Sequence, residues 1–326
     1  MITKRHLVLV VTLAIAAVAL WAAFRDVNFA QLWARMTQAD PLLIGLAALI
    51  HIASFLARTQ RWRLTMSSSA PLPWRQVFDA NMVCYLGNNY LPARAGEVAR
   101  IFTLAARSGV SRNFLFGTVV VERIADAAAL AGLLGAATAL LDAAPAWLSG
   151  GGGAMALGAP LVLVILLALP LFEEKLIALL ERSRLPQSFS ATLQHMLRQF
   201  LLGSRGLHQW RPLTAFLLWT GVWLTLEVGF MLTTALAVGV EAEPVVCALL
   251  FAALAFSSLA PSTPGYVGVF QLVAVLVLKP FGVGAEEALS LVLIYQAISY
   301  CVVTVLGVPA LWRIGGLRVL RQSASS

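Results

Sequence analysis

Charged residues are scarce in this chain. Only 12% of the 326 residues are charged, 60% are hydrophobic and the mean hydropathy is +0.85, whereas about 25% of the residues in soluble domains are charged. This composition excludes an ordinary soluble domain and predicts an all-α polytopic membrane protein. The net charge of +8 does not indicate nucleic acid, because the basic residues lie in short segments between apolar runs, as in the positive-inside pattern. We therefore expect no nucleic-acid partner.

Cysteine and histidine are also sparse, and their spacing indicates no metal site. The cysteines lie in apolar segments and the histidines are scattered: Cys84, Cys247, Cys301, His6, His51, His195 and His208. None of them pairs with another at the spacing of metal ligands. The chain also shows no nucleotide-binding glycine loop and no Ser-His-Asp or Cys-His arrangement. We expect no cofactor and no enzymatic activity, with catalysis by paired Glu122 and Asp126 as a distant alternative.

Long apolar runs predict six full membrane spans, each near or above the minimum of about 17 residues. These runs are 7–24, 41–57, 114–141, 155–172, 213–238 and 288–310. The first is longer than the apolar core of a signal peptide, about 7–15 residues, so we interpret it as a span. Two further apolar stretches, 77–106 and 244–279, are interrupted by polar, proline and glycine residues.

The distribution of basic residues predicts the orientation in the cell inner (cytoplasmic) membrane. We assign these residues to the cytoplasm: Lys4, Arg5, Arg58, Arg61, Arg63, Arg75, Lys175, Arg182, Arg184, Arg198, Arg205, Arg211, Arg313, Arg318 and Arg321. The opposite side carries Asp142, Glu241, Glu243, Glu286 and Glu287. Both termini are then cytoplasmic, and the loop 25–40, with Arg25 and Arg35, fits least well.

This orientation requires each interrupted stretch to enter the membrane and return to its own side. The sequence therefore predicts two re-entrant helical hairpins and an inverted repeat, with residues 1–142 as the first unit and 143–326 as the second. The spacing Pro92-x-x-x-Gly96 matches Pro261-x-x-x-Gly265, although proline and glycine also recur by chance at helix breaks. Facing breaks of this kind form binding sites in many transporters.

The segment 173–211 is the most polar part of the chain between the two units. Apolar residues recur at helical spacing within it, which predicts an amphipathic helix on the cytoplasmic leaflet that senses lipid or recruits a partner. The alternative is a connector that packs against the helix bundle.

Ionisable residues inside the apolar runs indicate the candidate site, because each costs at least about 2.5–3.5 kcal/mol at membrane depth. In the first unit we predict substrate binding by these residues and by two neighbouring amides, which together are Asn88, Asn89, Arg94, Glu97, Arg100, Glu122, Arg123 and Asp126. In helices, the spacings 94/97/100 and 122/126 place each group on one face, and residues 122–126 lie near mid-bilayer. Arginine suits a phosphate group because its planar fork donates two hydrogen bonds. The alternative is that these residues pair with each other and only fix the hairpin.

The second unit carries neutral polar residues at the matching place. From this group we predict substrate contacts for Ser262, Thr263, Gly265 and Gln271. The alternative is that the hydroxyl groups bond only to their own helix backbone. Glu227, alone in the span 213–238, is either a proton carrier or the counter-ion of a buried arginine, and we favour the counter-ion.

Three motifs together carry a resemblance that covers nearly the whole chain. They are Asn88-x-x-Leu91-Pro92-x-Arg94-x-Gly96-Glu97-x-x-Arg100, Glu122-Arg123-x-x-Asp126 and Pro261-x-x-Pro264-Gly265-x-x-Gly268. In these residues the chain resembles the flippase-like family related to the transmembrane domain of lysylphosphatidylglycerol synthase.

The resemblance implies a stand-alone lipid-translocating membrane domain without a synthase domain. The expected substrate is an anionic phosphate-bearing lipid: a phospholipid, a polyprenyl-phosphate-linked sugar or a lipid of a hopanoid pathway. The alternative is a non-transporting membrane scaffold for a partner enzyme, either a lipid-modifying enzyme or a glycosyltransferase.

Overall fold

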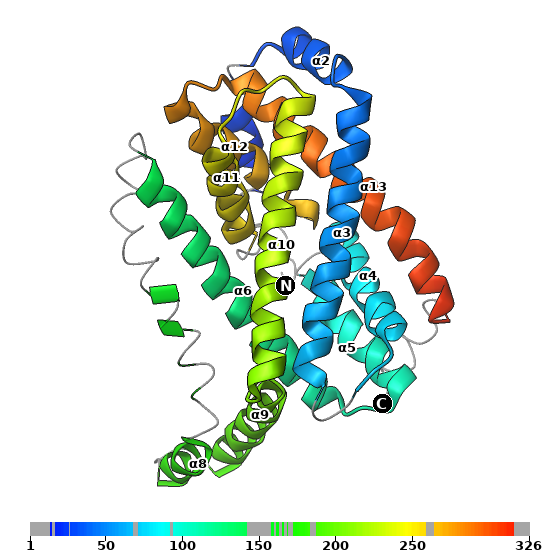
Figure 1. The fold of residues 1–326 in the computed structure, drawn as a ribbon, viewed down its shortest axis with the longest axis vertical. Helices are drawn as coiled ribbons and strands as arrows, with labels where there is room; N and C mark the ends of the chain where they lie inside the picture. The colour runs from blue at the N-terminus through cyan, green and yellow to red at the C-terminus, as the bar shows by residue number, and fades with distance from the viewer. Residues whose placement is uncertain are drawn as a thin grey trace, which may run out of the picture.

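We describe a computed structural model of the chain. It describes residues 14, 17–25, 27–67, 71–91, 94–141, 158, 159, 161, 162, 165, 168, 172–182, 187–258 and 264–315. Every regular element within these ranges is a helix, which agrees with the predicted all-α class (Figure 1). Pro92, Pro261, Ser262 and Thr263 lie outside the described residues, as do half of the predicted span 7–24 and most of the predicted span 155–172.

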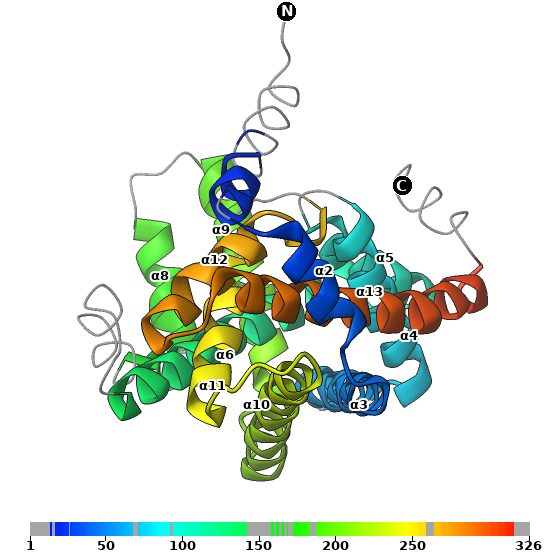
Figure 2. The ribbon, with the colours of Figure 1, turned by 90° about the horizontal axis from the view of Figure 1, so that it is seen from above.

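Two long helices lie side by side in the middle of the view of Figure 1, α3 (Pro41–Met66) and α10 (Trp210–Ala237), and Figure 2 shows that this pair lies along one face of the molecule. The Asp40 side chain caps α3 by accepting from the amides of Leu42 and Leu43. The amide of Asp40 donates to the carbonyl of Ala237 over 2.8 Å. The start of α3 therefore adjoins the end of α10, and the two helices are antiparallel.

Both interrupted stretches are pairs of helices that pack on each other. The first consists of α4 (Trp74–Tyr90) and α5 (Ala95–Ser108). The second consists of α11 (Pro244–Ser257), a short 3-10 turn η3 (Pro264–Tyr266) and α12 (Val269–Leu278).

The first hairpin turns back because its helices meet at glycine. A Cβ atom on Gly96 would lie only 1.9 Å from the carbonyl oxygen of Cys84 on α4, so this close approach requires glycine. At the other end of the hairpin, Asp79 of α4 and Arg107 of α5 form an ion pair of 3.1 Å. The hairpin is thus a feature of the structure, while its re-entry into a membrane stays a prediction.

The contacts of one half of the chain recur in the other half. Helices α6 (Arg112–Leu140) and α13 (Ala285–Arg313) flank the central pair. Helix α4 packs against α13 and α11 packs against α6; likewise α5 contacts α6 and α12 contacts α13. The shorter helix α2 (Phe29–Thr37) packs on α13 at one end of the molecule, and α9 (Gln187–Arg205) packs on α6 at the other (Figure 1). Exchange of the two halves therefore preserves these contacts between helices.

Three helices in the described part are long and apolar enough to cross a membrane: Pro41–Thr65, Trp210–Ala237 and Ala285–Arg313. They coincide with three predicted spans, 41–57, 213–238 and 288–310. Helix α6 coincides with the predicted span 114–141 and is 29 residues long. The count of six spans stays a prediction.

The segment 173–211 contains two helices, α8 (Glu173–Arg182) and α9. Leu201 of α9 is fully buried, and a Cβ atom on Gly203 would lie 2.7 Å from the backbone of Gly117 on α6. These contacts favour a connector that packs against the bundle.

At the opposite end of the molecule, Arg35 pairs with Glu287 over 2.7 Å, which neutralises the charge that fitted the predicted orientation least well.

The apolar core has two main parts with charged residues between them. The larger part involves α3, α10, α11, α12 and α13, and the smaller part involves α3, α4, α5 and α6. The Arg61 guanidinium lies 4.6 Å from the Trp223 ring of the larger part. The Arg100 guanidinium lies 4.6 Å from the Trp62 ring of the smaller part. Charge is therefore buried where the two parts meet.

Candidate functional site

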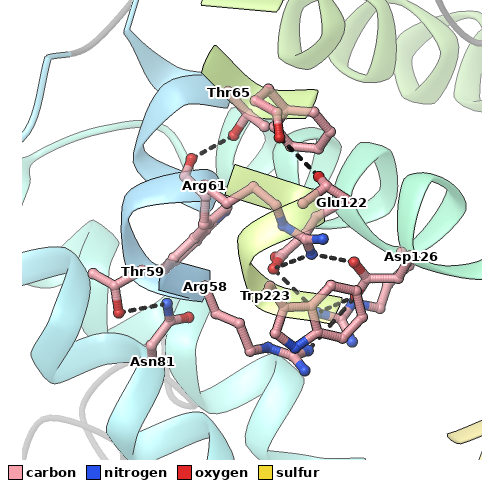
Figure 3. A network of polar contacts seen from close by, with 12 residues as sticks. Arg58, Thr59, Arg61, Thr65, Asn81, Glu122, Asp126 and Trp223 are labelled. Atoms are coloured by element: carbon pink, nitrogen blue, oxygen red, sulfur yellow. Dashed lines mark hydrogen bonds and ion pairs between the residues drawn. The ribbon is translucent and has the colours of Figure 1, made fainter. Parts of the chain in front are cut away.

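Two arginines of the site come from the central helix α3. Arg61 is fully buried and forms ion pairs with Glu122 and Asp126 of α6, while Arg58 lies 3.6 Å from Asp126 (Figure 3). The Trp223 ring of α10 lies over both guanidinium groups. Arg58 and Arg61, which we predicted beyond the end of the span 41–57, lie within α3, because this helix continues through both residues to Met66. The side of the membrane on which they lie stays a prediction.

Glu122 is the centre of the ion-pair network. Its carboxylate is fully buried and lies 3.4 Å from Arg61, 2.9 Å from Arg100 and 3.3 Å from Arg123. Three guanidinium groups from three helices thus share one carboxylate. A buried carboxylate of this kind needs paired cations, because its desolvation is costly.

Helix geometry supplies the remaining pairs. Asp126 lies one turn after Glu122 on α6 and forms an ion pair with Arg123 over 3.2 Å. Glu97 of α5 pairs with Arg100 over 2.9 Å and with Arg123 over 3.6 Å. The charged faces that we predicted for 94/97/100 and 122/126 therefore meet in the structure through Glu97, Arg100, Glu122 and Arg123.

Neutral amides and hydroxyls attach this network to the hairpin. Arg100 donates to the Asn81 side chain of α4 over 3.1 Å, and Asn81 donates to Thr59 of α3 over 3.3 Å (Figure 3). These bonds join α3, α4 and α5, and the ion pairs of Glu122 add α6. The inner part of the network thus fixes the first hairpin, as the structural alternative expects.

A cavity of about 190 Å³ lies beside the network. Its lining combines both halves of the chain: Arg58, Tyr85, Asn88, Asn89, Arg94, Glu97, Arg123, Asp126, Ala127, Leu130, Trp223, Phe251, Ala255, Ser258 and Tyr266. The Arg94 guanidinium donates to the Ser258 hydroxyl over 2.9 Å, which connects residues 164 positions apart. The two helix breaks therefore face each other across the cavity.

Strained backbone marks both breaks. Arg94 has φ +53° and Tyr266 has φ +61°, and they are the only non-glycine residues with positive φ in the part of the chain that the structure describes. Such a conformation costs roughly 1–3 kcal/mol and persists only where the surrounding structure enforces it. Both residues line the cavity, so the strain places polar side chains at its wall.

Charge is not balanced within this site. We define the charged cluster as Arg58, Arg61, Arg94, Arg100, Arg123, Glu97, Glu122 and Asp126. Its five guanidinium groups exceed its three carboxylates by two positive charges. A buried excess of one sign is unfavourable in a medium of low dielectric constant, and an anion in the cavity would compensate it.

The cavity lining also carries buried donors without a hydrogen-bond partner among the described residues. They are the Nε atoms of Arg58, Arg94 and Arg123 and the hydroxyl of Tyr85. A buried donor without a partner costs about 1–3 kcal/mol. A guest with several acceptor oxygens would satisfy them.

The second unit holds its break with amides. Gln271 of α12 donates to the Gln296 oxygen and accepts from the Gly268 amide over 2.7 Å. Gln296 of α13 donates to the Gly265 carbonyl over 2.9 Å. Gln271 and Gly265 therefore shape the turn and do not line the cavity described above, and Ser262 and Thr263 lie outside the described residues.

The predicted residues of the first unit fall into two groups. Asn88, Asn89, Arg94, Glu97, Arg123 and Asp126 line the cavity. Arg100 and Glu122 lie behind the lining and hold it in place through their ion pairs.

Sequence reasoning missed Arg58, which lines the cavity, and Arg61. A signal was present, because His51, Ser54, Arg58 and Arg61 recur at steps of three and four residues, which is one face of a helix.

Glu227 contacts a histidine and a serine, although we favoured a buried arginine as its partner. Its carboxylate lies 3.7 Å from His51 Nδ1 and accepts from the Ser54 hydroxyl over 2.9 Å. None of the described ion pairs joins it to an arginine, so its interpretation as an arginine counter-ion is wrong.

A separate ion-pair triad lies at the far end of the first hairpin. The buried Asp79 pairs with Arg107 over 3.1 Å and with Arg313 of α13 over 2.6 Å. It joins α4 to α5 and α13 without lining the cavity.

Comparison with known proteins places this architecture in a family. The model of the lysylphosphatidylglycerol synthase TM region matches residues 9–307. A curated relative, Glycosyltransferase AglD of Haloferax volcanii, is 28% identical over 273 residues, which cover 72% of this chain and 42% of that protein. The chain thus spans less than half of the relative's length. Because the family model covers nearly all of it, this membrane protein belongs to the family of the lysylphosphatidylglycerol synthase transmembrane region.

Proposed function

We propose that this protein moves an anionic, phosphate-bearing lipid between the leaflets of the cytoplasmic membrane. The headgroup occupies the cavity between the two helix breaks, and the acyl or prenyl chains stay in the surrounding lipid. Arg58, Arg94 and Arg123 contact the phosphate, while Glu97 and Asp126 hold the guanidinium groups in place.

The observation that carries this proposal is the excess of positive charge beside unsatisfied donors. The charged cluster carries two more guanidinium groups than carboxylates. Each of its five arginines has a buried Nε without a hydrogen-bond partner among the described residues, and three of these arginines, Arg58, Arg94 and Arg123, line the cavity. A phosphate group supplies both the negative charge and the acceptor oxygens. A neutral guest can supply acceptor oxygens but no negative charge, and a cationic guest would add to the excess of positive charge.

The recurrence of contacts between the halves supports transport. Many transporters bind their substrate between two inverted repeats and expose it to each side in turn. Here the cavity is lined by both halves, and Arg94 and Ser258 connect them across it. An inverted repeat of 1–142 and 143–326 is the arrangement that this mechanism requires, and it stays a prediction.

The alternative function is a non-transporting membrane scaffold for a lipid-modifying enzyme or a glycosyltransferase. The name of the Haloferax relative favours this alternative, since that protein is named a glycosyltransferase. We propose that the chain itself is not an enzyme, because the charged side chains of the cavity pair with each other in ways that suit binding.

Lipid movement in liposomes tests the proposal. The purified chain is reconstituted in phosphatidylcholine vesicles that contain fluorescent phosphatidylglycerol, phosphatidic acid or a polyprenyl-phosphate sugar, and outer-leaflet label is quenched chemically. We expect transbilayer movement of at least one of these anionic lipids and none of labelled phosphatidylcholine. Co-purification with a partner enzyme and no lipid movement would favour the scaffold.

Arginine-to-lysine substitutions test the assigned contacts. Arg94→Lys and Arg123→Lys retain the charge but lose the planar fork, so the transport rate should fall about tenfold or more while the thermal midpoint stays near wild type. Arg107→Lys is the matched control, because Arg107 pairs with Asp79 outside the cavity. If Arg94→Lys and Arg123→Lys both transport at the rate of Arg107→Lys, phosphate recognition does not reside in this cavity.

A further inference from the structure

A second buried polar group lies next to the charged cluster. His51 and Ser54 of α3 meet Glu227 of α10 and Ser299 of α13, and the His51 and Glu227 side chains are 6% and 5% exposed. Neither side chain contributes to the cavity lining or to the ion pairs with arginine. A buried histidine and a buried carboxylate within two candidate membrane spans are costly, which indicates a function beyond packing.

The position of His51 leaves one ring nitrogen facing the carboxylate. Its ring lies between Phe55 and Phe230, with centroids 4.5 and 4.3 Å away, and its Nε2 atom lies 3.2 Å from the Ser299 hydroxyl. Its buried Nδ1 atom has no hydrogen-bond partner among the described residues and lies 3.7 Å from Glu227 Oε2. The pair can therefore hold a proton between the two side chains.

The other titratable groups around this pair come from three helices. Arg58 lies on α3, Tyr85 on α4 is in contact with Phe55 and Arg58, and Tyr295 on α13 stacks on Phe230. The two tyrosines are uncharged phenols at neutral pH. Arg58 is thus the fixed charge that responds to a proton on the pair.

One side chain connects the pair to the cavity. The Trp223 indole donates to Glu227 Oε1 over 3.4 Å, and the same ring lies over the guanidinium groups of Arg58 and Arg61 at 4.7 and 4.6 Å. Trp223 also lines the cavity. The Trp223 indole alone therefore separates the Glu227 carboxylate from the guanidinium groups of Arg58 and Arg61.

We propose that His51 and Glu227 form a proton-binding site coupled to the headgroup site, so that the lipid anion moves together with a proton. This inference rests on the proposed function. With no proton on the pair, neutral His51 and ionised Glu227 add one negative charge beside the arginines and oppose the anion. A proton on the pair removes that net charge and strengthens anion binding, and by linkage the anion strengthens proton binding by the same factor. The proton belongs to the pair, since the two groups titrate together.

Calorimetry of a soluble anionic lipid tests the coupling directly. Dihexanoyl-phosphatidylglycerol is titrated into the full chain in detergent, in two buffers of different ionisation enthalpy, which yields the number of protons taken up per anion. We expect uptake approaching one proton in wild type and an affinity that falls up to about tenfold per pH unit where the pair titrates. His51→Gln and Glu227→Gln should each bind the anion with that uptake and pH dependence lost.

A matched variant of α10 is Thr234→Val, because the Thr234 hydroxyl is fully buried and bonds only to its own helix, at the Phe230 carbonyl. It should take up protons as wild type does. Binding by wild type without proton uptake, or equal uptake by wild type and both pair variants, overturns the coupling and leaves the proposed function intact. If the wild type binds no anion and moves no lipid in vesicles, the proposed function fails first. Proton uptake by the wild type tests the coupling even if one of the variants does not fold.

Vesicles with a pH gradient supply the transport test. Wild type should move fluorescent phosphatidylglycerol several-fold faster toward the alkaline side than against the gradient. Glu227→Gln should retain exchange that is insensitive to the gradient. A gradient response in Glu227→Gln and His51→Gln equal to that of wild type would contradict the proposal.

Discussion

The two halves of this protein build the same junction with different chemistry. In the first half, α5 meets α6 through Arg100 and Glu122, 2.9 Å apart and fully buried. In the second half, α12 meets α13 through the amides of Gln271 and Gln296. Both junctions fix a hairpin beside a helix break. Two neutral amides therefore suffice to hold such a junction.

This difference bears on why the first half carries charge. Buried ion pairs contribute little net stability compared with well-packed neutral groups. If fixing the hairpin were the sole role, the amide solution of the second half would serve in the first half as well. The comparison of the two junctions therefore supports the proposed anionic ligand, whose charge would balance the excess of guanidinium groups.

The largest effect should come from neutralising the centre of the charged junction. Glu122→Gln retains the shape of the side chain but leaves Arg61, Arg100 and Arg123 without their shared carboxylate. We expect a loss of about 3–5 kcal/mol in the free energy of unfolding, measured by titration from mild detergent into SDS.

The equivalent change in the second half should cost less. Gln296→Leu removes the partner of Gln271 and of the Gly265 carbonyl, which leaves neutral groups unsatisfied at about 1–3 kcal/mol. Equal losses for Glu122→Gln and Gln296→Leu would mean that charge adds nothing special to the first junction, and the comparison of the halves would fail.

The helix breaks should differ in how they tolerate a methyl group. A Cβ atom on Gly96 would lie 1.9 Å from the Cys84 carbonyl oxygen, so Gly96→Ala must separate α4 from α5, at about 1–3 kcal/mol or more. A Cβ atom on Gly265 would lie 1.2 Å from the Tyr300 hydroxyl, which belongs to a side chain.

Tyr300→Leu should therefore restore part of the stability lost in Gly265→Ala. The part that remains, about 1 kcal/mol, reflects the φ of +65° at this residue. Thermal midpoints of the single and double variants measure this. A double variant no more stable than Gly265→Ala alone would show that the Tyr300 contact does not limit the second break.

The sequence pattern anticipated the elements that depend on local signals. Apolar runs located α3, α10 and α13, and the Pro/Gly interruptions located both hairpins. It placed the end of α3 too early, at residue 57, because Arg58 and Arg61 look like loop residues that flank a span. Their burial depends on Glu122 and Asp126, which lie more than 60 residues away, and a local window carries no information about such partners.

The contacts of uncharged residues were harder to anticipate. Gln271 lies in the segment where a substrate contact was predicted, yet both ends of its amide are bonded to Gln296 and Gly268. Glu227 was recognised as unusual, but its partner His51 is on another helix and is 176 positions away in the sequence. Residue type indicated that these side chains are special, and only the packing of α3, α10 and α13 decides what they touch.

The smallest effect concerns the direct bond between the two breaks. Ser258→Ala removes the acceptor of Arg94 and should lower the free energy of unfolding by about 0.5–1.5 kcal/mol. Because this bond joins the halves in the state described here, its loss favours separation of the breaks and should change the transport rate by less than about tenfold. Ser257→Ala is the matched control, since the Ser257 hydroxyl bonds only to the Leu254 carbonyl of its own helix. If both substitutions change the unfolding free energy and the transport rate equally, the hydroxyl of Ser258 has no specific role, and the charge of Arg94 alone distinguishes the first break from the second.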